Sequence, residues 1–139
     1  MTNLIRFLNL KFSEKVFLAH CIIVLCFIRI ALSLKCASFI MRTISAIQVT
    51  EEGDQKTARM IAWGVVACAR FVPGATCLTQ ALAGQYLMAR HNCRSIVRIG
   101  IERDNRNNMK AHAWLLSGGF VVLGGQASDM PRYATMVDI

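Results

Sequence analysis

The sequence predicts an α+β fold, in which a series of helices is followed by a small antiparallel sheet. Apolar residues recur with helical spacing as far as Arg90. Beyond Asn92 the pattern changes to short β-rich segments separated by glycine and polar residues. The length of 139 residues suits one domain, and helices that precede the strands instead of alternating with them are typical of this class.

The composition excludes several classes of protein. With 55% hydrophobic and 17% charged residues, the chain cannot be intrinsically disordered or of low complexity. The net charge of +8 is spread thinly, and its densest group, between Arg90 and Lys110, is interrupted by Glu102 and Asp104. No nucleic-acid-binding motif accompanies that group. The charge therefore predicts a solvated face, and no nucleic acid is expected as a partner.

The first apolar segment, Val16–Leu34, predicts a helix that starts near Ser13. The segment is 19 residues long, which is just enough to span a bilayer. His20 and Arg29 lie within it, however, and an arginine in a spanning helix is costly. We therefore expect a helix that is covered by the core or by a partner, with a transmembrane span as the less favoured reading.

Three further helices follow, over Ala37–Val49, Gln55–Arg70 and Cys77–Arg90. Asp54 and Thr76 are suited to cap the last two of them, because their side-chain oxygens can accept free amides of a first turn. Pro73 and Gly74 break the chain between those two helices.

Strands are predicted over Ser95–Glu102, Ala111–Leu116 and Phe120–Leu123. The last two are joined around Gly118 and Gly119, which is a strong hairpin signal. The tail from Gly124 contains Pro131 and is expected to be irregular.

The six cysteines predict free thiols in a reducing cytoplasm, because they form no C-x-x-C pair and no cleavable signal precedes them. His and Cys are neighbours only at His20–Cys21 and His91–Cys93, without the paired spacing that zinc needs. No metal or other cofactor is expected.

A catalytic cysteine–histidine pair is predicted from Cys77 and His112. Cys77 is the first residue of a predicted helix, and His112 lies 35 residues later in a predicted strand, with Trp114 on the same strand face. Amides at a helix start stabilise a thiolate and can hold the oxyanion formed when it attacks a carbonyl. The imidazole can take and return the proton. Spacing alone leaves open that the cysteine is a core residue and the histidine a structural one.

The chain resembles the B proteins of lasso-peptide biosynthesis, which are transglutaminase-like cysteine proteases that remove the leader from a ribosomally made precursor. The resemblance rests on Val72–Leu78, the helix after it, the strand IVRIGIE and Ala111–Trp114 ahead of the Gly-Gly hairpin. It implies an N-terminal helical region, 1–53, and a papain/transglutaminase-like core, 54–139, with a catalytic helix packed on a small antiparallel sheet. It also implies that Cys77 is the nucleophile and His112 the general base.

The third catalytic residue departs from the family pattern, which places an Asp on the strand after the histidine. The positions that should face His112 are Gly124 and Gly125. We favour Asp129, because an ionised partner best stabilises an imidazolium. Gln126, a backbone carbonyl or an unassisted dyad are the alternatives.

Thr76, Trp114 and Tyr86 are expected to contact the substrate, the two aromatics as walls of a pocket between the catalytic helix and the hairpin. The recognition domain common in this family is not visible in the helical first part of the chain. The resemblance therefore implies that a separate protein recognises the leader. The apolar N-terminal helices are the expected docking surface for that protein or, alternatively, for the ATP-dependent cyclase. Peripheral membrane attachment is left open.

Three other functions fit the residues. The same dyad could transfer the acyl group to an amine, as transglutaminases do. The chain could instead be a small basic membrane protein without catalysis, or a degenerate scaffold that lacks the third residue.

Overall fold

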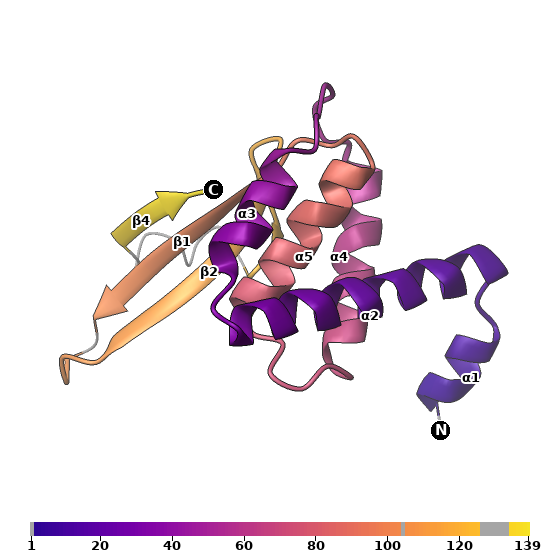
Figure 1. Cartoon of the computed structure of the whole chain (residues 1–139). Helices are drawn as coiled ribbons and strands as arrows, with labels where there is room; N and C mark the ends of the chain where they lie inside the picture. The colour runs from indigo at the N-terminus through magenta and orange to yellow at the C-terminus, as the bar shows by residue number, and fades with distance from the viewer. Residues whose placement is uncertain (1, 104, 126–133) are drawn as a thin grey trace.

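The structure is a computed structural model that describes residues 2–103, 105–125 and 134–139. Within these residues, helices precede strands along the chain (Figure 1), which confirms the predicted fold class. The helices are α1 (Thr2–Leu8), α2 (Phe12–Ser33), α3 (Ala37–Ser45), α4 (Gln55–Ala69) and α5 (Cys77–Arg90). The strands are β1 (Ile96–Arg103), β2 (Met109–Ser117), β3 (Phe120–Leu123) and β4 (Ala134–Asp138).

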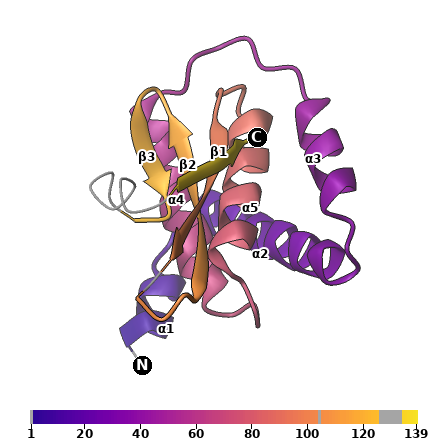
Figure 2. The same cartoon turned by 90° about the vertical axis from the view of Figure 1, so that its left-hand side faces the viewer.

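Helix α5 occupies the centre of the molecule. It packs against α2 and α4 on one side and against β2 on the other, so that the sheet lies in front of the helices in the view of Figure 2. Its buried residues include Leu82, Leu87 and Met88, each with no exposed surface. One hydrophobic core thus joins the helices to the sheet and fixes the position of α5 relative to β2.

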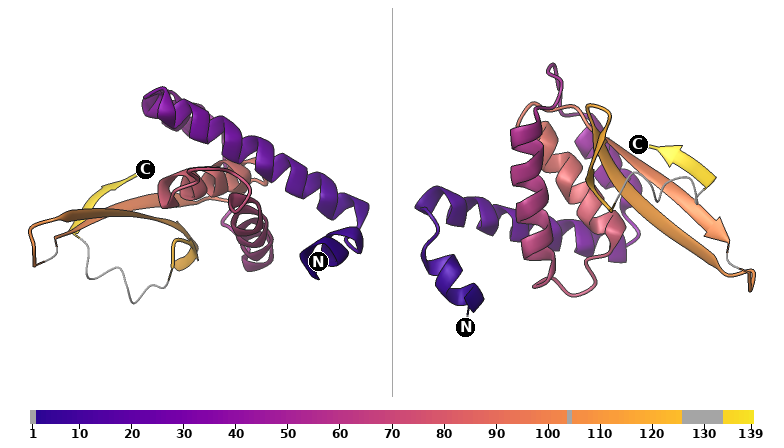
Figure 3. Two further views of the ribbon diagram at one scale, coloured as in Figure 1. Left: turned by 90° about the horizontal axis from the view of Figure 1, so that it is seen from below. Right: turned by 180° about the vertical axis from the view of Figure 1, so that it is seen from behind.

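The four strands form one antiparallel sheet in the order β3-β2-β1-β4. The long β1–β2 hairpin projects beyond the helices (Figure 3). The tail does not stay irregular as expected, because β4 pairs with the free edge of β1. Val97 and Ile139 exchange two backbone hydrogen bonds of 2.9 and 2.8 Å there. That prediction was wrong because the strand depends on a distant edge, which local sequence does not show.

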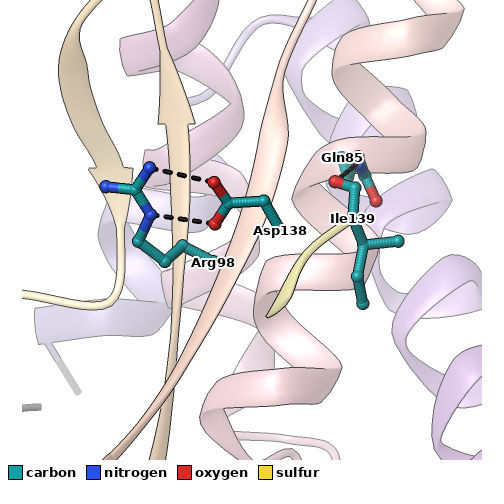
Figure 4. A network of polar contacts seen from close by, with 4 residues as sticks. All are labelled: Gln85, Arg98, Asp138 and Ile139. Atoms are coloured by element: carbon teal, nitrogen blue, oxygen red, sulfur yellow. Dashed lines mark hydrogen bonds and ion pairs between the residues drawn. The ribbon is translucent and has the colours of Figure 1, made fainter. Parts of the chain in front are cut away.

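Side-chain contacts fasten β4 to its neighbours (Figure 4). Arg98 donates two hydrogen bonds to the Asp138 carboxylate, at 2.9 and 3.0 Å. Gln85 of α5 donates to the main-chain oxygen of Ile139 at 2.8 Å. The last strand is therefore held both to the sheet and to the central helix.

The helix boundaries agree with the sequence where a cap is present. Asp54 accepts the Thr57 amide at 2.7 Å, so α4 begins at the predicted residue. Helix α2 begins at Phe12, next to the predicted start at Ser13, but the N-cap is Lys11, whose amide donates to Glu14 at 2.9 Å. Helix α1 lies in the predicted N-terminal helical region but was not predicted as a separate helix, since it is short and has no acidic residue in its first turn.

Helix α2 is long and apolar enough to cross a membrane by length and composition. One of its faces, which includes Cys21, Leu25 and Ile28, is instead buried against α4 and α5. The other face is exposed. The fold thus favours a core helix with one uncovered side over a span surrounded by lipid.

Candidate active site

Cys77 is the first residue of α5, as predicted. Thr76 is the N-cap, and its hydroxyl oxygen accepts the Thr79 amide at 3.4 Å. The first intrahelical hydrogen bond runs from the Gln80 amide to the Thr76 carbonyl at 3.0 Å. The Cys77 and Leu78 amides come before that bond, so they are available for an anion at the helix start. The Cys77 side chain is half-buried.

The turn before Cys77 is held from two directions. Gln80 donates to the Ala75 carbonyl at 3.1 Å. Gly74 has a positive φ of 73°, and the Arg29 guanidinium of α2 lies so close that a Cβ at Gly74 would sit 2.5 Å from its Nε. A side chain at this turn would therefore strain the backbone and would displace the Arg29 guanidinium.

This role of Arg29 was not predicted from the sequence, where the residue was considered only as a charge that makes a membrane-spanning helix unfavourable. A single cation inside an otherwise apolar helix does carry a signal, since such a charge usually meets a polar partner in the folded chain. Here that partner is the Ser33 hydroxyl, at 2.6 Å, together with the turn at Gly74.

Helix α5 and strand β2 run in the same direction. A Cβ at Gly84 would lie 2.7 Å from Leu115 Cδ2 and 2.6 Å from Leu123 Cδ1. Further along both elements, Met88 and Ser117 lie together around Gly53. The closest approach of helix to sheet is therefore at Gly84, where only glycine leaves room for the two leucines.

Cys77 and His112 both lie near the starts of these two elements. Cys77 precedes Gly84 by two helical turns, so it lies on the same side of α5, about 10 Å nearer the helix start. His112 precedes Leu115 by three residues, which is also about 10 Å along a strand. Cys77 and His112 therefore lie on two elements that pack against each other, α5 and β2.

The His112 ring is fixed by contacts on its own sheet face. Its Nε2 forms a hydrogen bond with the Gly124 carbonyl oxygen. The ring also meets Trp114 edge to face, with 4.6 Å between the centroids. The β1 residue opposite His112 is Gly100, which brings no side chain against the ring.

Gly124 is required where it contacts His112. Its φ is 105°, and a Cβ there would come 2.5 Å from the Ala113 carbonyl oxygen. The predicted position facing His112 was correct, and the backbone-carbonyl alternative is the contact observed. Asp129 and Gln126 lie outside the described residues, so the assignment of an ionised third member stays a prediction.

The strand faces separate the two candidate groups. Ala113 and Leu115 point into the helical core, so His112 and Trp114 belong to the opposite face of β2. Among the residues that the structure describes, no hydrogen bond joins the Cys77 thiol to the His112 ring. A direct contact between sulfur and imidazole therefore stays a prediction.

Tyr86 does not share a pocket with Trp114, and that expectation was wrong. Tyr86 meets His20 of α2 edge to face at 6.5 Å and lines an apolar groove of about 350 Å³ between α2 and α3. It follows Cys77 by two and a half turns, which puts it on the side of α5 away from the sheet. Trp114 is 1% exposed on the sheet, and the Thr76 hydroxyl is engaged as a cap.

Two of the other cysteines, Cys21 and Cys68, differ from Cys77 in their surroundings. Cys21 and Cys68 are buried between α2 and α4, and the Cys68 thiol donates to the Leu18 carbonyl at 3.4 Å. The hydrogen bond with Cys68, and after it burial, raises the pKa of Cys21 well above its ordinary value. Both therefore behave as core thiols, whereas Cys77 is half-buried at a helix start.

Comparison with known proteins identifies the family of the chain. Searches among curated proteins and among solved structures found no significant match. A family model described as the transglutaminase-like superfamily matches residues 24–138, a range that includes both Cys77 and His112. Because the match extends from the middle of α2 to β4, the chain belongs to the transglutaminase-like superfamily.

Proposed function

We propose that the protein is a cysteine peptidase that removes the leader peptide from a ribosomally made lasso-peptide precursor before ring closure. The observation that supports this proposal is the position of Cys77 at the start of α5, a largely buried helix that packs on the strand of His112. Membership of the transglutaminase-like superfamily supports cysteine-dependent chemistry. The resemblance of the motifs around both residues supports the substrate.

In the first step the Cys77 thiolate attacks the carbonyl carbon at the leader–core junction. The free amides at the start of α5 stabilise the oxyanion that forms. The proton taken from the thiol by His112 passes to the departing nitrogen, which becomes the new N-terminus of the core peptide. The leader is left as a thioester on Cys77.

In the second step His112 takes a proton from water, which attacks the thioester. The leader leaves with a new carboxylate, and the thiol is regenerated. Trp114, buried beside the imidazole, limits the access of other water molecules to the His112 ring.

The Gly124 carbonyl supports this role of His112. A carbonyl can only accept a hydrogen bond, so it favours the tautomer with the proton on Nε2 and makes Nδ1 the basic nitrogen. We retain Asp129 as the candidate ionised partner that stabilises the imidazolium. A separate recognition protein would deliver the leader, as the family resemblance implies.

The test first identifies a short precursor and a recognition protein among the reading frames that neighbour the gene, and then combines both with the full chain. Mass spectrometry should show two fragments whose masses sum to the precursor plus one water. Cys77→Ala should lower this cleavage at least about 10³-fold. Cys36→Ala, at another half-buried cysteine, is the matched control and should cleave normally.

Unchanged cleavage by Cys77→Ala would overturn the proposal and favour the scaffold reading. The second candidate, acyl transfer to an amine, is favoured only by the superfamily match. It predicts a cross-linked product that has lost ammonia or an amine, instead of fragments that have gained water.

A further inference from the structure

Helix α2 carries an exposed apolar row along its outer side. The row consists of Phe12, Val16, Ile23, Phe27, Ile30 and Leu34, which are 82, 53, 65, 58, 60 and 69% exposed. Their spacings of three, four and seven residues put them on one straight line. Over the length of the helix, that line extends for about 33 Å. An apolar surface of this extent is rarely left in contact with water.

Helix α1 continues the apolar surface beyond the start of α2. Its Leu4, Ile5 and Leu8 are 64, 59 and 62% exposed. The helix lies at the end of α2 that is far from the sheet (Figures 1 and 3). It precedes residue 24, where the superfamily match begins. This surface therefore includes a segment outside the family match.

The charges around this surface are almost all positive. Residues 1–42 contain six basic side chains, Arg6, Lys11, Lys15, Arg29, Lys35 and Arg42, against the single acidic Glu14. Arg29 faces the Gly74 turn, so the other five lie before or after the long apolar stretch of α2. Basic groups at both ends of an apolar row are the pattern that anionic lipid headgroups complement.

The orientation of α2 follows from its buried face. Leu18, Leu25 and Ile28 are committed to the core with α4 and α5, so the helix cannot turn all its sides to lipid. Only the outer row is left, and a helix with one apolar side lies in the plane of the interface.

We propose that α1 and the outer row of α2 bind the surface of an anionic membrane, with the α2 axis parallel to the bilayer. The exposed phenylalanine and aliphatic side chains enter the acyl boundary. The lysines and arginines at the two ends of the row meet the headgroups. This proposal is independent of the chemistry at Cys77.

The test is co-sedimentation of the full chain with lipid vesicles. One set contains about 30% phosphatidylglycerol in phosphatidylcholine, and the other contains phosphatidylcholine alone. Binding to the anionic set should be the stronger, and should weaken when salt rises from about 0.1 to about 0.5 M. The triple variant Phe12→Gln, Ile30→Gln, Leu34→Gln should bind at least about tenfold more weakly.

The matched control is Phe71→Gln with Met109→Gln, which removes apolar side chains that are 75 and 62% exposed but lie outside the row. It should bind as the unchanged protein does, and circular dichroism should show all variants folded. Cys77→Ala should also bind normally, so a failed peptidase assay leaves this result intact. Equal binding to both vesicle sets, normal binding by the triple variant, or a row covered in solution by a second copy or by the recognition protein would overturn the proposal.

Discussion

Helices α5 and α2 show opposite uses of an apolar sequence. Nine of the 14 residues of α5 are buried, because α2, α4 and the sheet surround it. Helix α2 is more apolar, yet only six of its 22 residues are buried. The apolar residues of α5 fix that helix between α2, α4 and the sheet, whereas those of α2 exceed what the core can cover.

The largest expected difference is in the free energy of unfolding, between a substitution at a buried leucine of α5 and one at an exposed residue of α2. Leu82 has no exposed surface, so Leu82→Ala should lower the free energy of unfolding by about 2–5 kcal/mol through the cavity it leaves. Ile30 is 60% exposed, and Ile30→Ala should change it by less than about 0.5 kcal/mol. Urea unfolding measures both. Similar losses would contradict the contrast between the two helices.

The next effect concerns the glycine that contacts His112. Gly124→Ala should destabilise the fold by about 1–3 kcal/mol more than Gly119→Ala. Both glycines have positive φ, but a Cβ at Gly119 would meet nothing within 4 Å. The comparison therefore isolates the clash with Ala113. Precursor cleavage should fall only in Gly124→Ala. Equal cleavage by both variants would show that the Gly124 carbonyl plays no part in catalysis.

Arg29 connects α2 to the turn that precedes α5. Arg29→Gln removes the guanidinium that packs on the Gly74 turn, so Cys77 should be less well positioned and cleavage should fall about tenfold. Arg42→Gln, at an exposed residue of α3, should leave cleavage unchanged. Cleavage rates and thermal unfolding are measured for both. A loss of stability without a loss of kcat would give Arg29 a purely structural role.

The smallest effect is a dependence of stability on pH at β4. The Arg98 guanidinium lowers the pKa of Asp138 below its ordinary value of 3.8. The pair therefore adds stability above pH 4 or so, and this is lost as pH falls through the lowered pKa. Both side chains are partly exposed, so the contribution should stay below about 1 kcal/mol. Urea unfolding of Asp138→Asn should lack this component, and an identical pH profile would refute it.

The helix of the candidate nucleophile was predictable from residues close in sequence. Asp54 and Thr76 cap the helices that they precede, and Pro73–Gly74 separates those helices as expected. Hydrogen bonds of this kind span only a few residues, so the local sequence specifies them. For the same reason Cys77 could be placed in a first turn without any knowledge of the fold.

Only the tertiary structure decided which distant residues meet. It brought Arg29 to Gly74, the Gly124 carbonyl to His112, and Ile139 to the edge of β1. It also turned Tyr86 away from the sheet and toward His20. These contacts depend on how helices and strands pack, and many sequences share the same local pattern while packing differently. The sequence by itself therefore determined the elements and the candidate chemistry, and packing determined their surroundings.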